Sequence, residues 1–144
     1  MHSLQFRIVG ESLIPEDLTT LFNMQPKYSY KKGDEITCHR LDCEHPINAT
    51  YSEGGWLTDI HFLDDQSIER DIEDFVVRFS PFSNQIKELV NGNKYYSTLW
   101  LTAEPEDVQL HFRISPDVIS RLFDMGITFG VSIMSLQDIY AGRY

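Results

Sequence analysis

One stretch of the chain, residues 64–90, constrains the fold more than any other. Its apolar residues recur at steps of four, three, one and three, which gather into one stripe on an α-helix of 3.6 residues per turn. The stripe consists of Ile68, Ile72, Phe75, Val76 and Phe79. Because such a stripe must be covered by another apolar surface, we expect this helix to pack on a β-sheet.

The opposite side of the same helix is expected to be acidic. Residues 64–74 contain six acids and one base, a local charge of −5 within a chain whose net charge is −10. The acids expected to face water are Asp64, Asp65, Glu69, Asp71, Glu73 and Asp74. Such a charge block is either a solubilising surface or a docking face for a basic protein.

Length and charge narrow the class of protein. A chain of 144 residues is expected to form a single globular domain over residues 1–144. The net charge of −10 argues against binding nucleic acid or an anionic membrane, because both ligands favour clustered Lys and Arg. No apolar run approaches the roughly 20 residues of a membrane helix, and the N-terminus enters a strand pattern directly. We therefore expect a cytosolic protein.

The apolar patterns, prolines and turn residues of the remaining chain predict an α+β domain. Strand patterns cover residues 4–9, 36–41, 56–62, 95–103, 108–114 and 127–133, and helix patterns follow Pro15, Pro81 and Pro116 in addition to the helix that carries the stripe. The turn at residues 104–107 predicts a hairpin between its two flanking strands. We expect a mostly antiparallel sheet of about six to seven strands, ferredoxin-like in part, with the helices packed on one face.

Two clusters could hold a bound group. Cys38, His39, Cys43 and His45 are ligand types that zinc prefers, but the types interleave instead of forming paired knuckles. We expect reduced thiols and surface imidazoles there, with no metal and no cofactor. The loop at residues 27–34 has three lysines that could hold a phosphate. Since no glycine-rich turn opens a helix there, a solvated loop is the simpler interpretation.

A catalytic alternative depends on two of the expected strands. Asp59 and His61 share one side of the first, and Gln109, His111 and Arg113 share one side of the second. If both sides belonged to one open sheet face, an acid, a base and a cation could meet, as phosphodiester cleavage requires. An ordinary solvated sheet face accounts for the same pattern. The chain has no hydrolase, metalloprotease or nucleotide-binding motif.

Several features together resemble a bacterial family of domains of unknown function, number four-two-seven-nine. They are the opening strand FRIVG, the Ile14-Pro15 helix start, Pro26, the Gly33-Asp34 pair, Trp56 in a strand, the helix and break from Phe75 to Pro81, and Asp124-Met125-Gly126 before the last strand. The resemblance implies a small bacterial cytosolic α+β domain. Some relatives look like immunity proteins encoded beside secreted toxins, and no catalytic residue comes with the resemblance.

The first functional hypothesis is therefore a non-enzymatic immunity-type protein. It would neutralise a basic toxin, such as a nuclease, through the acidic helix surface, with Tyr95, Tyr96 and Trp100 as candidate aromatic anchors. The second hypothesis is a small hydrolase that uses His61 and His111. The third is a housekeeping interaction module that self-associates through an exposed sheet edge.

Overall fold

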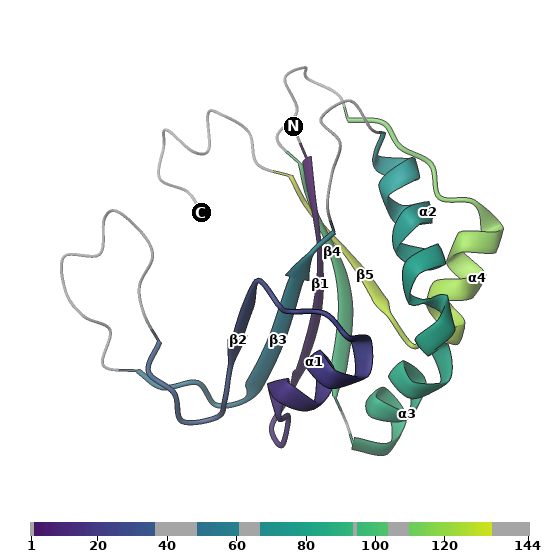
Figure 1. Cartoon of the computed structure of the whole chain (residues 1–144). Helices are drawn as coiled ribbons and strands as arrows, with labels where there is room; N and C mark the ends of the chain where they lie inside the picture. The colour runs from purple at the N-terminus through teal and green to yellow at the C-terminus, as the bar shows by residue number, and fades with distance from the viewer. Residues whose placement is uncertain (1, 37–48, 61–66, 94, 104–109, 134–144) are drawn as a thin grey trace, which may run out of the picture.

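The computed structural model describes residues 2–36, 49–60, 67–93, 95–103 and 110–133, and Figure 1 shows their arrangement. The elements are β1 (His2–Gly10), α1 (Pro15–Phe22), β2 (Tyr28–Tyr30), β3 (Gly54–Asp59), α2 (Ile68–Phe79), the 3-10 turn η1 (Ser80–Phe82), α3 (Ser83–Asn93), β4 (Tyr96–Ala103), α4 (Pro116–Asp124) and β5 (Thr128–Ile133). The expected α+β class is confirmed.

The strands form one sheet in the order β2-β3-β1-β4-β5. The first strand of the chain is its centre, and β1 pairs antiparallel with both β3 and β4. At one edge β2 pairs antiparallel with β3, and at the other β5 pairs parallel with β4. The parallel pair is possible because α4 carries the chain back between the two strands. The described sheet has five strands, fewer than the six to seven expected.

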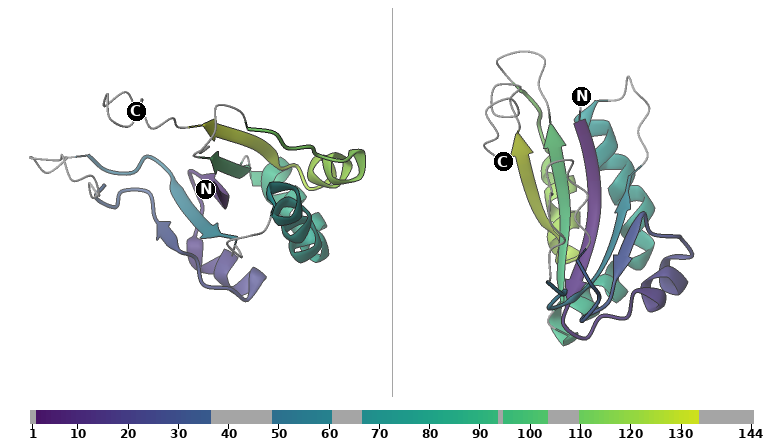
Figure 2. Two further views of the ribbon diagram at one scale, coloured as in Figure 1. Left: turned by 90° about the horizontal axis from the view of Figure 1, so that it is seen from above. Right: turned by 90° about the vertical axis from the view of Figure 1, so that its left-hand side faces the viewer.

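The helices cover one face of this sheet, as the left view of Figure 2 shows. Phe6 of β1 lies at the centre of the core, where its ring centroid is 5.0 Å from that of Phe75 and 4.8 Å from that of Phe79. Phe22 of α1 and Trp56 of β3 contact the same ring. All five residues of the α2 stripe are buried, so its prediction is confirmed.

A serine side chain caps the start of α2, and another caps the start of α4. The Ser67 hydroxyl accepts a hydrogen bond from the N–H of Arg70, and the Ser115 hydroxyl accepts one from the N–H of Val118. Each bond satisfies one of the amides that a first helical turn leaves unpaired. The break after Phe79 is only a 3-10 turn, so α2 and α3 follow each other without a loop.

Three sequence predictions about the sheet need correction. Residues 28–30, predicted as part of a loop, form the edge strand β2. Residues 110–114, predicted as part of a strand, form no strand and pair with none of the described strands. The predicted hairpin with β4 is therefore wrong, because the two neighbours of β4 are β1 and β5. The predicted strand at 36–41 lies almost entirely outside the described residues.

A search of the described helices for one long and apolar enough to cross a membrane finds none.

Candidate functional site

The water-facing side of α2 carries three acids with different surroundings. Glu73 is exposed. Glu69 is half-buried, and its carboxylate accepts a hydrogen bond of 3.0 Å from the backbone N–H of Arg113. Asp74 forms an ion pair with Arg70 one turn earlier, with 3.3 Å between Oδ1 and Nε. Of the three, Glu73 is therefore the acid most accessible to a partner.

Asp71 does not lie on this surface, so its prediction is wrong. The residue is 1 % exposed, and its Oδ2 lies 2.5 Å from Nε2 of His2 at the start of β1. It occupies the flank of the helix that faces the sheet, where a polar partner makes burial of a carboxylate possible. Asp71 joins α2 to the central strand and serves the fold.

The described part of the α2 surface is consequently less acidic than expected. Asp64 and Asp65 lie outside the described residues. Against Glu69, Glu73 and Asp74, the same helix presents the exposed bases Arg70 and Arg78. The strong local charge predicted from the sequence therefore depends on the two aspartates that precede the helix.

The residues of the catalytic alternative lie in different layers. Asp59 is on β3, where its carboxylate pairs with Lys27. His111 and Arg113 belong to the extended segment beside α2, in the helix layer. The common sheet face on which the catalytic alternative depended is therefore not formed by Asp59, His111 and Arg113. His61 and Gln109 lie outside the described residues, and so do Cys38, His39, Cys43 and His45. Among the described residues no cluster of His, Cys, Asp and Glu could hold a metal ion.

The basic loop is neutralised by carboxylates of the same chain. Lys27 pairs with Asp59, Lys31 with Glu16 at 3.1 Å, and Lys32 with Glu11 at 2.6 Å. The hydrogen bond and charge of Lys32 lower the pKa of Glu11. For Glu16 a bond from its own backbone N–H, followed by the bond from Lys31, lowers the pKa. Each of the three lysines already has an anion, which favours the interpretation as a solvated loop.

The uncovered face of the sheet has features that sequence reasoning missed. Tyr30 of β2 lies over Gly55, and Trp100 of β4 lies over Gly130, positions at which a Cβ atom would come within 2.2 Å of the ring. The Tyr30 ring also stacks on Tyr51 with 3.7 Å between centroids. Burial of the Tyr30 phenol raises its pKa. Glycine opposite an aromatic residue in neighbouring strands is the signal that could have revealed these pairs.

Arg7 lies on the same face, between the two glycine–aromatic pairs. Its Nη2 donates a 3.0 Å hydrogen bond to the side-chain oxygen of Gln5, whose amide in turn reaches Asp59 at 3.4 Å. Its Nε is buried and has no partner among the described residues. Arg, Tyr and Trp are the residues that most often dominate protein interfaces, so this face suits protein contact better than acid–base chemistry.

The aromatic anchors expected near the acidic helix lie away from it. Tyr96 and Trp100 share a side of β4 with Thr98, which pairs with Arg7 on the uncovered face. Tyr95 lies over Gly10 and its hydroxyl is 3.1 Å from that of Ser12. Since α2 covers the other face, neither Tyr96 nor Trp100 shares a continuous surface with its acids.

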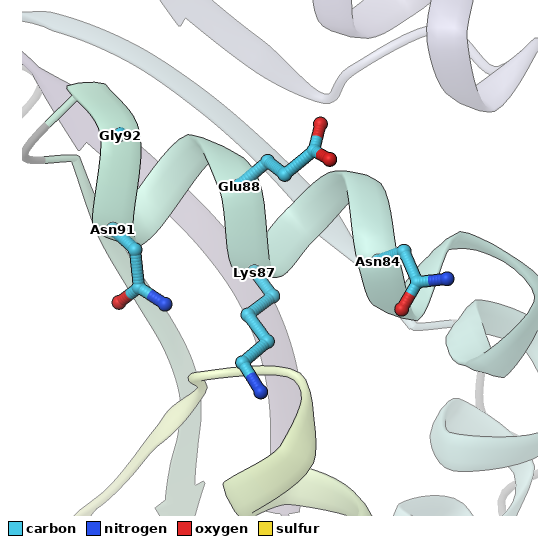
Figure 3. Close-up of a pocket in the computed structure, with 5 residues that line it drawn as sticks. All are labelled: Asn84, Lys87, Glu88, Asn91 and Gly92. Carbon is cyan, nitrogen blue, oxygen red and sulfur yellow. The ribbon is translucent and has the colours of Figure 1, made fainter.

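A hollow of about 430 Å³ lies along α3 (Figure 3). The described residues that line it are Asn84, Lys87, Glu88, Asn91 and Gly92, all exposed and all from one helix. The side chains of Lys87 and Asn91 extend to the same side of the helix, and that of Glu88 extends to the other. Because these residues do not enclose a ligand, the hollow is a weaker candidate site than the sheet face.

Comparison with known proteins agrees with the resemblance noted in the sequence. No curated protein and no solved structure matches the chain. The model of a family described as a domain of unknown function, DUF4279, matches residues 1–136 of the 144. With nearly its whole length matched, the chain belongs to the DUF4279 family.

Proposed function

We propose that this protein is a non-enzymatic, immunity-type binding domain of the bacterial cytosol that neutralises a basic protein, such as a nuclease toxin. The net charge of −10 supports the proposal, because an acidic protein attracts a basic partner over distances longer than a contact. A nuclease must present basic residues to hold its substrate, and an acidic inhibitor can occupy the same groove.

The observation that carries the proposal is the display of two neighbouring acids, Glu73 and Asp74, on a firmly packed helix. Five buried apolar residues fix α2 on the sheet, so Glu73 and Asp74 are displayed on a rigid element. A rigid display reduces the entropy lost on binding. We place Asp64 and Asp65 in the same contact surface on the basis of their sequence position, together with Glu69. Asp71 is excluded because it is buried.

We also propose that the segment from β1 to β4 is a ferredoxin-like unit extended by α4 and β5. What supports this is its order of strand, helix, two strands, helix and strand, with β1 and β3 in the middle of the four. In this description α4 and β5 are additions that a ferredoxin-like unit does not have.

The test begins with the partner and ends with a charge reversal. The product of the neighbouring reading frame is the first candidate partner, and co-purification from the native host would identify it. The variant Glu73→Lys/Asp74→Lys should slow association by about tenfold at low salt and reduce the salt dependence of the rate.

The matched control is Glu88→Lys on the exposed side of α3, which reverses charge on a different helix. It should slow association much less than the α2 variant does. An α2 variant that associates as fast as the unmodified protein, with the same salt dependence, would remove α2 from the interface.

A further inference from the structure

The last strand of the sheet has an unusual free edge. Strand β5 pairs with β4 on one side and has no strand on its other side among the described residues. Its sequence, TFGVSI, contains no charged residue and no proline. Free edges are normally guarded by short length, lysines or proline, because their unpaired N–H and C=O groups can pair with another chain.

The opposite edge of the same sheet is guarded in this way. Strand β2 has only three residues, and Lys27, Lys31 and Lys32 surround it. Two edges of one sheet therefore differ: β2 is short and flanked by charge, whereas β5 is twice as long and uncharged. Within the described ranges, the contrast makes the β5 edge the better candidate for pairing with another chain.

Apolar side chains line the same edge in the helix layer. On β5, Val131 is 41 % exposed and Ile133 is 57 % exposed, although both lie on the helix side of the strand. On α4, Ile119 is 54 % and Phe123 is 82 % exposed. These four residues are called the edge patch below.

The geometry of α4 directs its part of the patch toward β5. Val118 and Leu122 belong to the buried core, and α2 and α4 run in the same direction (Figure 1). From the right-handed turn of the helix we infer that Ile119 and Phe123 lie on the flank next to β5, and Asp117 and Arg121 on the other flank. Asp117 and Arg121 form their own ion pair at 3.2 Å.

We propose that two copies of this chain associate by antiparallel pairing of their β5 strands, so that one continuous sheet runs through both. A two-fold axis at this edge makes the contact self-complementary. Charge favours this site: with a net charge of −10, two copies repel each other, and β5 is a strand along which backbone can approach backbone with no like charges in register.

The exposed residues of α4 favour a second copy over an unrelated strand. An added strand would pair with the backbone of β5 but would leave Phe123 in water, because α4 belongs to the helix layer. A second copy brings its own α4 to the axis, where Ile119 and Phe123 of both copies can pack together. Contact between helices also enlarges the interface toward the roughly 1,200 Å² typical of a stable association.

Pairing through β5 leaves the acidic surface of α2 free. The proposed dimer is therefore independent of the proposed toxin-binding role. Its test is the mass of the full chain in solution, by sedimentation equilibrium from about 1 μM to about 1 mM. We expect a concentration-dependent species of twice the chain mass of 16.8 kDa. Phe123→Asp and Ile133→Lys should each weaken the association at least about tenfold while the circular dichroism spectrum stays unchanged.

The control is Val77→Lys, because Val77 is 70 % exposed on α2 and outside the edge patch. It should leave the dimer intact. Hydrogen exchange gives a second measurement: outward-facing amides of β5 should become protected as concentration rises, and Phe123→Asp should abolish this rise. Monomer at every concentration would overturn the proposal, and so would a dimer that both edge-patch variants leave unchanged.

Discussion

The bond between Asp71 and His2 gives the sharpest test of how α2 is held. Replacing Asp71 with Ala removes a buried carboxylate that lies 2.5 Å from Nε2 of His2. A hydrogen bond that involves a charged group contributes about 1.5–3 kcal/mol, and an acid in a first helical turn adds about 0.3–1 kcal/mol. Since His2 is 18 % exposed and can be hydrated once its partner is gone, we expect a total cost of about 2–4 kcal/mol.

Urea unfolding followed by circular dichroism measures this cost. Asp71→Ala should lower the midpoint with little change in slope, and the melting temperature should fall by about 5–15 °C. Glu73→Ala, on the exposed side of the same helix, should change stability by less than about 0.5 kcal/mol. Asp71→Lys should be worse than Asp71→Ala, because it buries an unpaired charge.

A double-mutant cycle with His2→Ala isolates the pair itself. We expect a coupling of about 1–3 kcal/mol between the two positions. Additive effects of the two substitutions would show that the bond contributes nothing. Equal stability of the Asp71→Ala and Glu73→Ala proteins would refute the conclusion that Asp71 is a structural residue.

Four further substitutions, with a control at Val77, test other parts of the fold. Phe75→Ala should cost about 3–5 kcal/mol in urea unfolding, because the ring is fully buried against Phe6 and Phe79; Val77→Ala should cost less than about 0.5 kcal/mol. Gly130→Val should displace the Trp100 ring, which a Cβ atom would approach within 2.2 Å, and shift its fluorescence to longer wavelength at a cost of about 1–3 kcal/mol. Gly92→Ala, with open space at its Cβ, should instead stabilise α3 by about 0.5–1 kcal/mol. Because burial raises the pKa of Tyr30, its neutral form is favoured in the folded state. The resulting stabilisation of the folded state is fully present below the ordinary phenol pKa and is lost as pH rises through the pKa of Tyr30 in the folded protein. Tyr30→Phe should therefore reduce the loss of stability at alkaline pH, measured as the free energy of unfolding against pH.

Local sequence patterns correctly predicted those helices and strands whose own residues determine which side is buried. The α2 stripe is periodic over the 12 residues of the helix. In β1 the alternation of Leu4, Phe6 and Ile8 corresponds directly to the buried side. In each case the residues that determine the buried side lie within the helix or strand itself.

Errors arose where a distant partner decides the outcome. Asp71 lies on the flank of the helix, and it is buried because His2, 69 residues earlier, supplies its bond. Residues 110–114 alternate like a strand, but Phe112 packs on Phe129 and Arg113 donates its backbone N–H to Glu69, so the segment stays beside α2. Apolar residues at every second position indicate an extended backbone with one covered side. They do not indicate which element covers that side.

The candidate surface was only partly predictable for the same reason. Glu73 was correctly assigned to the exposed side of α2, because the helical period alone determines it. The group around Arg7 could not be predicted without the register that places β1 between β3 and β4. Likewise, the position of β5 at the edge of the described sheet follows from strand order, which local sequence patterns do not contain.

The central position of β1 also has a consequence for how the protein is made. Strand β1 ends at Gly10 and leaves the ribosome long before β4, which ends at Ala103. At about 5–20 residues per second, the time between the synthesis of the two strands is roughly ten seconds. Throughout that time a strand with three fully apolar inward residues has at least one side without its final neighbour. The nascent chain should therefore bind chaperones early and complete its sheet only after β4 and β5 have been made.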